Sequence, residues 1–327
     1  MPLLEVRDLV TEFRSSGGTV RAVDGVSLTV EPGEILGLVG ESGCGKSATC
    51  RSILQLFGGS QGRIVSGQVL LNGIGDLAKM TERQMQMVRG KEASFIFQDP
   101  LTALNPTMRV GRQISEGAER HLGLGRHAAH QLAVDLLREV HVPSPERRVD
   151  AWPHEFSGGL RQRVVIAMAL AMQPRLIIAD EPTTALDVTV QNQILRLLAE
   201  RRQKHQTAII LVTHDLGVVS EICDRVAVMY AGRIVETGSV DEVLDNPTHP
   251  YTRALLAALP SAAMRGQPLI PIEGAPPSLV APPPGCRFAP RCAFATDMCR
   301  QGLPPELAAR GGQATGHLDA CILGEGR

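Results

Sequence analysis

The chain has 327 residues, of which 43% are hydrophobic and 20% charged, and its formal net charge is −1. This composition is that of a globular protein with one large domain or two ordinary ones. A net charge near zero argues against non-specific electrostatic binding to nucleic acid. An aromatic content of 3% leaves few rings for stacking on single-stranded bases.

The sequence shows neither a membrane span nor a secretory signal. Its longest strongly apolar stretch, Val164–Met172, is about half of the ~20 residues that cross a bilayer. The N-terminal MPLLEVRDLVTEF carries acids early and lacks a basic start followed by an apolar core. We therefore expect the protein to stay in the cytoplasm, with its seven cysteines as thiols or metal ligands rather than disulfides.

The first part of the chain is predicted to form strands around a glycine-rich loop. The initial thirty-five residues are rich in β-formers, with turns at RSSGGT and EPGE. A short apolar strand at Ile35–Val39 runs into the loop, and a helix at Ala48–Leu56 follows it. Further strands are predicted at Gly67–Asn72 and Ala93–Gln98.

From about Pro100 to Val149 the sequence becomes helical in character, with helical spacing clearest in Ala128–Val140. We interpret residues of about 100–157 as a helical subdomain inserted between core strands. The core then resumes with alternating helices and strands, predicted at Gly158–Met172, Leu176–Asp180, Val188–Gln203 and Ala208–Thr213. Such alternation predicts an α/β fold with a parallel sheet covered on both faces.

After about Leu259 the chain changes to a tail rich in proline and cysteine. Seven prolines between Pro268 and Pro284 favour extended or irregular backbone over helix. Four of the seven cysteines also lie here. The predicted organisation is therefore a nucleotide domain at residues 1–259 and a C-terminal extension at 260–327.

Residues 40–47, GESGCGKS, match the phosphate-binding loop pattern G-x-x-x-x-G-K-[ST]. A chance glycine-rich turn is the alternative, but the predicted strand and helix lie where this pattern requires them. Glycines let backbone N–H groups surround phosphates, while Lys46 can reach the β- and γ-phosphates and Ser47 can ligate Mg²⁺. The predicted nucleotide-binding residues here are Gly40, Glu41, Ser42, Gly43, Cys44, Gly45, Lys46, Ser47 and Ala48.

Cys44 lies inside this loop, close to a helix N-terminus, where the pKa of a thiol is expected to be depressed. We therefore predict that alkylation inhibits ATP hydrolysis, that ATP protects, and that Cys44→Ser is resistant. A small filler residue without a chemical role is the alternative.

The segment LIIADE at 176–181 supplies the acids that such a loop needs. Its apolar strand brings Asp180 to the strand tip, where a carboxylate can hold Mg²⁺ through water, and Glu181 follows, placed to polarise the attacking water. A solvated strand end could carry two acids as well, but here they follow the phosphate loop in the order typical of a P-loop NTPase.

The stretch EFSGGLRQR at 155–163 resembles the LSGGQ signature of ABC ATPases, with Phe156 for the leucine and Leu160 for the glutamine. A serine hydroxyl and bare backbone at a helix N-terminus make an anion site. The resemblance implies a head-to-tail dimer in which this stretch meets the ATP of the opposite subunit. The signature residues carried over are Ser157, Gly158, Gly159, Arg161 and Gln162.

Other positions are similar to the same family one by one. Gln98 in FQDP resembles the Q-loop glutamine, Asp187 in Ala185–Asp187 the D-loop aspartate, and His214 the switch histidine. Phe13 is the best candidate for stacking on adenine, with an ordinary core phenylalanine as the alternative. The resemblance thus implies a catalytic group of Glu181, His214 and Gln98, and a Mg²⁺ site of Ser47, Gln98 and Asp180.

The segments 97–114, 153–167 and 246–252, together with the tail, look like the ATP-binding subunits of bacterial dipeptide/oligopeptide importers, from about Leu3 to Cys321. Nickel and glutathione importers share these segments. The resemblance implies ATP and Mg²⁺, two transmembrane permease subunits, a second ATPase subunit (paralogue or copy), an extracytoplasmic peptide-binding protein that acts indirectly, and no nucleic acid. It also implies a peripheral position on the cytoplasmic face of the inner membrane.

The tail cysteines, Cys286-x5-Cys292-x6-Cys299-x21-Cys321, do not have the paired C-x2-C spacing of a zinc ribbon. In several members of this family the spacing is associated with a [4Fe–4S] cluster, and four thiolates suit one. Free thiols, or a zinc site that includes His317, are the alternatives. A cluster here would be structural or redox-sensing, since the ATP motifs lie elsewhere in the chain.

Two other functions fit less well. Soluble ABC ATPases of DNA repair or translation usually carry two ATPase halves and basic recognition segments, whereas this chain has one half and a charge near zero. A non-hydrolysing module is disfavoured by Glu181 and His214. The predicted fold is therefore an α/β P-loop NTPase with an N-terminal antiparallel β subdomain, an inserted helical subdomain and a Cys/Pro-rich extension. The transported solute cannot be named, because fold-level kinship does not decide a substrate.

Overall fold

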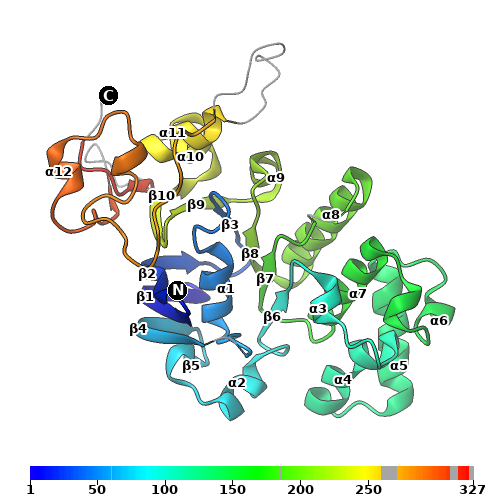
Figure 1. Ribbon diagram of the computed structural model, residues 1–327. Coiled ribbons are helices and arrows are strands. Elements are labelled where there is room, and N and C mark those ends of the chain that lie inside the picture. Colours follow the sequence, from blue (N-terminus) through cyan, green and yellow to red (C-terminus); the bar gives the residue numbers. More distant parts are fainter. Residues whose placement is uncertain (60, 184–185, 259–270, 310–315, 324–327) are drawn as a thin grey trace. The chain divides into compact units, whose positions relative to one another are not determined.

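The computed structural model describes residues 1–59, 61–183, 186–258, 271–309 and 316–323, and the chain divides into two compact units (Figure 1). Unit 1 is made of Met1–Leu3, Val30–Ile35 and Lys79–Val212, and unit 2 of Leu4–Thr29, Leu36–Ala78 and Thr213–Arg327. The predicted boundary at 259–260 lies outside the described residues. The described part of the tail belongs to unit 2.

Unit 1 combines a short parallel sheet with a group of helices. Its strands are β6 (Ala93–Ile96), β7 (Leu176–Asp180) and β8 (Ala208–Val212). Its helices are α2 (Glu82–Val88), α3 (Pro100–Ala103), α4 (Val110–Leu122), α5 (Arg126–Glu139), α6 (Pro145–Arg148), η2 (Pro153–Glu155), α7 (Gly158–Leu170) and α8 (Val188–His205).

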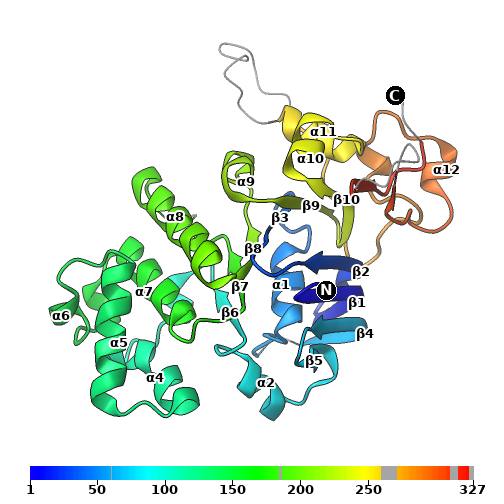
Figure 2. The ribbon, with the colours of Figure 1, turned by 180° about the vertical axis from the view of Figure 1, so that it is seen from behind.

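The sheet of unit 1 has β7 between β6 and β8, with both pairs parallel. Every residue of β7 and β8 is buried, which explains their continuous apolar sequences, since a parallel strand is covered on both faces. The region predicted as helical holds α3 to α6, with α4 and α5 side by side (Figures 1 and 2). The helix α7 packs against both of them.

Unit 2 is richer in strands. They are β1 (Leu4–Ser15), β2 (Gly18–Val30), β3 (Ile35–Val39), β4 (Gly62–Leu71), β5 (Gly75–Asp76), β9 (Arg225–Tyr230), β10 (Arg233–Ser239), β11 (Ala308–Ala309) and β12 (Leu318–Asp319). Its helices are α1 (Lys46–Ile53), η1 (Leu77–Lys79), α9 (Leu216–Ile222), α10 (Val240–Asp245), α11 (Pro250–Ala257), η4 (Ala289–Arg291) and α12 (Asp297–Arg300).

These strands form two groups. One is a sheet in the order β2-β1-β4-β5, in which β1 and β4 are antiparallel from Leu4↔Leu71 to Phe13↔Gly62. In the other, β3 is parallel to β9, and β9 is antiparallel to β10. The short strand β12 of the tail adds to β10 through the pair Glu236↔Asp319. The predicted N-terminal antiparallel β subdomain is therefore present.

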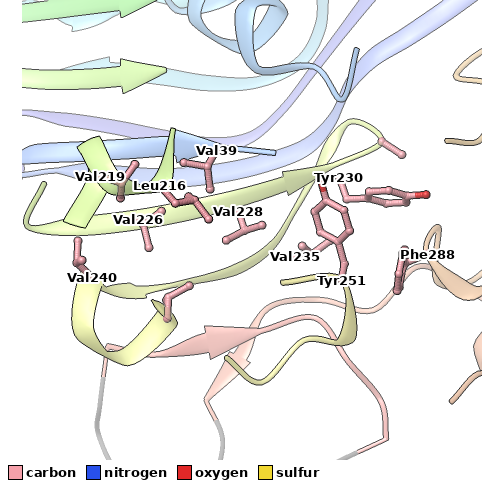
Figure 3. Packing of buried hydrophobic residues seen from close by; sticks show 12 residues of the cluster. Val39, Leu216, Val219, Val226, Val228, Tyr230, Val235, Val240, Tyr251 and Phe288 are labelled. Atoms are coloured by element: carbon pink, nitrogen blue, oxygen red, sulfur yellow. The ribbon is translucent and has the colours of Figure 1, made fainter. Parts of the chain in front are cut away.

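A buried apolar cluster holds this second group together (Figure 3). Valines of β9 and β10 face side chains of α9 and α10 there. At one end, Tyr230 of β9 meets Tyr251 of α11, with ring centroids 4.5 Å apart, and Phe288 of the tail packs edge-on against both rings. The tail thus contributes an aromatic side chain to the core of unit 2.

Most predicted elements are present with ends shifted by a few residues. The helix after the glycine-rich loop begins at Lys46 rather than Ala48, because the loop itself supplies its N-cap, Gly45. The N-terminal strands are two long ones rather than several short ones. The antiparallel pair β9–β10 and the helices α9 to α11 were not predicted, and the tail contains short helical turns and β12 despite its prolines.

Across the described residues, no helix combines the length and the apolar character needed to pass through a bilayer.

Candidate nucleotide-binding site

The phosphate loop of unit 2 connects β3 to α1, as predicted. Gly40 and Gly45 have φ of 145° and 111°, and a Cβ at these positions would lie 2.1 Å from the carbonyl oxygen of Met229 and 2.4 Å from that of Ala22. Only glycine fits such a backbone. Lys46 is buried, and its Nζ donates to the carbonyls of Gly40 at 2.7 Å and Glu41 at 3.0 Å. The lysine is therefore folded back over its own loop.

The remaining loop residues are more open. Ser42 and Gly43 are exposed at the tip, with Gly43 at φ 77°, while Ser47 and Ala48 are half-buried on the first turn of α1. An exposed tip of small residues over a helix N-terminus leaves backbone N–H groups accessible to an anion, which is the geometry that phosphate binding requires.

Cys44 does not have the properties predicted for it. Its side chain is 4% exposed, and burial raises the pKa of its thiol, an effect that the nearby Lys46 ammonium, 3.8 Å from Sγ, offsets only in part. The predicted depression of its pKa is wrong, because desolvation of the thiolate outweighs the helix N-terminus and the lysine. Its sulfur fills space behind Gly40, where an added Cβ would lie 3.0 Å away.

In unit 1, the acids at the end of β7 differ in exposure. Asp180 is 1% exposed, and Glu181 is half-buried with φ 46°, a left-handed conformation that is uncommon for this residue type. Its N–H donates to the carbonyl of Val212 at 3.0 Å. The amide of Gln98, at the end of β6, donates to the Glu181 carboxylate at 2.8 Å. The structure therefore brings together two predicted catalytic residues that lie 83 positions apart.

The signature stretch begins α7. Ser157 is its N-cap, and its hydroxyl accepts a long hydrogen bond, 3.4 Å, from the N–H of Leu160. Gly158 is exposed, with no atom within 4 Å of an added Cβ, and Gly159 would meet only the side chain of Leu186 at 3.2 Å. These residues present the helix N-terminus at the surface of unit 1.

The structure does not support two of the signature residues as surface contacts. Gln162 is 2% exposed, and its amide donates to the carbonyl of Phe97 at 3.3 Å, which ties α7 to the segment before Gln98. Arg161 is half-buried and donates to the carbonyl of Pro153 at 2.8 Å. One turn into α7, both side chains turn toward their own unit, whereas the residues before them face outward.

The other predicted positions are placed as follows. Asp187 is exposed and caps α8 by accepting from the N–H of Val190 at 3.0 Å, while Ala185 lies outside the described residues. His214, in unit 2, is exposed in the turn between β8 and α9. Phe13 is half-buried near the end of β1, where its ring meets Phe57 edge-on at 6.0 Å. Whether it contacts adenine stays a prediction.

Tyr251 and Arg291 contact the phosphate loop directly, although the sequence alone indicated no role for either. The hydroxyl of Tyr251 accepts from the N–H of Glu41 at 2.8 Å, and Arg291 forms an ion pair with the Glu41 carboxylate at 2.7 Å. Tyr251 belongs to the segment 246–252 that carries the family resemblance, whereas Arg291 had no distinguishing signal except its place next to Cys292.

The four tail cysteines line one small pocket beside Phe288. Burial raises the pKa of the Cys286 and Cys292 thiols. His317 is not among the residues that line this pocket, and its Nε2 lies 2.7 Å from the buried carboxylate of Glu236, so its position does not favour the zinc alternative. Within the described residues, no three His, Cys, Asp or Glu side chains are arranged to hold a single metal ion.

Comparison with known proteins agrees with the motifs. A family model described as ABC transporter matches residues 23–184, and one described as oligopeptide/dipeptide transporter, C-terminal region, matches 235–299. The oligopeptide transport ATP-binding protein OppD of Bacillus subtilis is 53% identical over 93% of this chain and 85% of its own length. The chain belongs to the oligopeptide/dipeptide family of ABC transporter ATP-binding subunits. It is thus an ATPase of the ABC class.

Two further likenesses bear on the family and on the fold, respectively. The dipeptide transport ATP-binding protein DppD of Bacillus subtilis is 47% identical over 92% of this chain and 90% of its own length. Among solved structures, a dimeric ATP-binding cassette, MJ0796, in a post-hydrolysis state with ADP and Pi has a TM-score of 0.66 at 23% identity, over 72% of this chain and 98% of that one. The predicted P-loop ABC fold is confirmed.

Proposed function

We propose that this ABC ATPase subunit drives import of di- or oligopeptides through membrane permease subunits. The observation that carries the proposal is the match of residues 235–299 to the C-terminal region of oligopeptide/dipeptide transporters, a region that generic ABC cassettes need not have. Relatives near 50% identity that are named for oligopeptide or dipeptide transport support it further. Nickel or glutathione import by the same machinery is the alternative.

In unit 2, the loop N–H groups and Lys46 would bind the phosphates of ATP. The buried ammonium of Lys46 already interacts with two carbonyls of its loop, so an entering phosphate replaces weak acceptors with a charged one. Ser47, at the start of α1, would be a ligand of Mg²⁺. His214 is exposed, and we assign it to the γ-phosphate.

In unit 1, Glu181 would act as general base toward the attacking water. Gln98, whose amide donates to Glu181, would orient that carboxylate and join Asp180 as a Mg²⁺ ligand. Asp180 is the last residue of β7, and a carboxylate oxygen at this strand end is a suitable ligand for Mg²⁺. When bound, Mg²⁺ supplies positive charge that stabilises the phosphate oxygens.

We further propose that two ATPase subunits close head to tail around ATP. Ser157, Gly158 and Gly159 would contact the nucleotide of the partner, which is supported by the exposure of Ser157 and Gly158 at the N-terminus of α7, where Gly159 is half-buried. The partner is a paralogue or a second copy. Two permease subunits, and through them an extracytoplasmic peptide-binding protein, would complete an assembly at the cytoplasmic face of the inner membrane.

A [4Fe–4S] cluster held by Cys286, Cys292, Cys299 and Cys321 is the second part of this proposal. Its support is that all four cysteines, drawn from 36 residues of chain, line one pocket with apolar neighbours. Four thiolates would be the protein ligands of the cluster. When bound, it would supply a rigid cross-link and a redox centre.

The cluster is tested by purifying the full chain without oxygen and measuring iron, acid-labile sulfide and visible absorbance. About four irons per chain are expected. A colourless protein without iron or sulfide contradicts the proposal, and zinc found in their place favours the alternative. Cys223→Ser is the matched control, since this cysteine lies outside the pocket and its loss should leave the iron content unchanged.

The transport function is tested by affinity purification of the tagged chain from detergent-solubilised membranes, followed by mass spectrometry and uptake assays. Two polytopic permeases, with peptide uptake that stops in a Glu181→Gln strain, are the expected result. Uptake of nickel or glutathione in place of peptides would select the alternative solute. Ribosomal or DNA-repair partners without any membrane protein would contradict import. Glu200→Gln, an exposed glutamate paired only loosely with Lys204 at 3.5 Å, is the control.

A further inference from the structure

The segment between the first two tail cysteines, Cys286–Cys292, carries two arginines that are both buried. Arg287 is 5% exposed as a residue, and the side chain of Arg291 is 4% exposed. Burying a guanidinium is unfavourable unless its donors meet acceptors, so the partners of these two side chains show what the segment is built to hold. Those partners include Glu41 of the phosphate loop and Ala231 in the turn that supports it.

The two Nη atoms of Arg291 bind the carboxylate of Glu41, the second residue of the phosphate loop. Nη1 and Nη2 lie 2.7 and 3.1 Å from the two carboxylate oxygens, which is the bidentate geometry of a strong ion pair. The same guanidinium donates to the carbonyls of Ile272 and Glu273 at 3.1 and 2.9 Å. The Glu41 pairing raises the pKa of Arg291, so its charge is permanent.

Tyr251 holds the backbone of the same residue. Its hydroxyl accepts from the N–H of Glu41 at 2.8 Å, and its fully buried ring packs against the rings of Tyr230 and Phe288 (Figure 3). Burial raises the pKa of Tyr251, so the hydroxyl stays neutral at any physiological pH. Side chain and backbone of Glu41 are thus both fixed by residues more than 200 positions away.

Arg287 reaches the other end of the loop through one intermediate turn. Its guanidinium donates to the carbonyl of Ala231 and to the carboxylate of Asp24. The next residue in that turn, Gly232, donates its N–H to the carbonyl of Cys44 at 2.7 Å. The tail therefore supports the phosphate loop at its first turn directly and at its last turn through Ala231 and Gly232.

We propose that Arg291 and Tyr251 are positioning residues for ATP, and that docking of the tail and binding of ATP favour each other. An unneutralised carboxylate on Glu41 would repel the triphosphate from the loop, and Arg291 removes that repulsion while holding the carboxylate in place. Because coupling between two sites is reciprocal, ATP must in turn stabilise the docked Cys286–Cys292 segment. The coupling needs neither the transported solute nor a metal in the cysteine pocket.

The first experiment measures the Kd of the full-length chain for a fluorescent ATP analogue with Mg²⁺. Arg291→Gln should raise Kd by about fivefold or more, with KM rising and kcat little changed. Adding Glu41→Gln to it removes the repelling charge and should restore most of the affinity. Arg291→Lys keeps the charge but loses the bidentate geometry, so its Kd should lie between those of the wild type and Arg291→Gln. A wild-type Kd in Arg291→Gln, or a double variant no better than the single one, overturns the proposal.

The second experiment follows amide hydrogen exchange in residues 286–300 with and without MgATP. ATP should slow exchange there in the wild type but not in Arg291→Gln. Tyr251→Phe, which keeps the ring and loses the acceptor, gives the same test if Arg291→Gln folds poorly. Arg300→Gln is the matched control, because that arginine pairs with exposed Asp297 at 3.5 Å. No effect of ATP on the tail of the wild type contradicts the coupling.

Discussion

The phosphate loop and the signature stretch are both glycine-rich turns before a helix. They differ in whether the backbone of the same chain excludes a side chain at the glycine. Gly40 and Gly45 have positive φ, and backbone oxygens stand where their side chains would be. Gly158 has neither feature: an added Cβ would meet nothing within 4 Å. The glycines of the phosphate loop are thus required by the fold of this chain, whereas Gly158 leaves room for something outside it.

A glycine can therefore be needed at a position for either of two reasons. A residue that is required by its own fold affects stability and function together when it is replaced. A residue that is small for the sake of a partner affects function alone. Three predictions below apply this distinction to single glycines and a fourth concerns Cys44 in the same loop, from the largest expected effect to the smallest.

Gly45→Ala should abolish ATP binding at ordinary concentrations. Positive φ and a backbone contact at 2.4 Å together impose strain of about 3 kcal/mol or more, which corresponds to roughly 100-fold or more in affinity. Isothermal titration with MgATP and a thermal melt measure both consequences. An unchanged Tm with normal affinity would show that the loop can relax without loss.

Gly158→Ala should lower ATPase activity by roughly 100-fold, because a methyl group misplaces the surface that meets the partner's nucleotide. Its Tm and its affinity for ATP as a monomer should stay at the wild-type values, since its position in this chain is open. Phosphate release and titration are the measurements. A fall in Tm similar to that of Gly45→Ala would remove the distinction between the two loops.

Gly43→Ala tests the cost of a positive φ in the phosphate loop apart from any steric clash of the added Cβ. Gly43 has φ 77° but no atom near an added Cβ, so only the conformational cost of about 1–2 kcal/mol applies. The affinity for MgATP should fall by roughly 5- to 30-fold, less than for Gly45→Ala. An equal loss in both variants would mean that backbone conformation, and not crowding, governs the loop.

Cys44 should react slowly with a maleimide at pH 8, and Cys44→Ser should change ATPase activity little. Burial raises its pKa, so the thiolate fraction at this pH is below that of an ordinary cysteine, whose pKa is about 8.5, and it increases only as the pH rises further. Peptide mass spectrometry after timed alkylation gives the rate for each cysteine. Rapid modification of Cys44 that ATP prevents would restore the view that it is reactive.

Sequence patterns located the phosphate loop, the acids after β7 and the signature stretch because each is a short contiguous motif attached to one strand or helix. Candidate roles could therefore be assigned to residues such as Lys46 and Glu181 from the sequence alone. Burial could not be found in this way. The predicted pKa of Cys44 was wrong because burial of its side chain raises that pKa. The burial of Gln162 was not predicted because the side of α7 that faces inward depends on what packs against the helix.

The tail also combines one feature that the sequence indicated with another that only the structure shows. Its cysteine spacing pointed to a common site, and the four residues do line one pocket. Nothing in the spacing predicted that the segment between the first two cysteines would carry arginines to Glu41 and Asp24, which lie 250 and 263 positions away.

By itself, then, the sequence determined the family, the order of the ATP motifs and the chemical type of each motif residue, because these are encoded by local runs of residues. Tertiary structure alone decided which glycines are sterically required, that burial raises the pKa of the Cys44 thiol, and that the tail supports the phosphate loop. Those properties arise from contacts between distant segments, and such contacts form only when the core of unit 2 brings β9, α11 and the tail together.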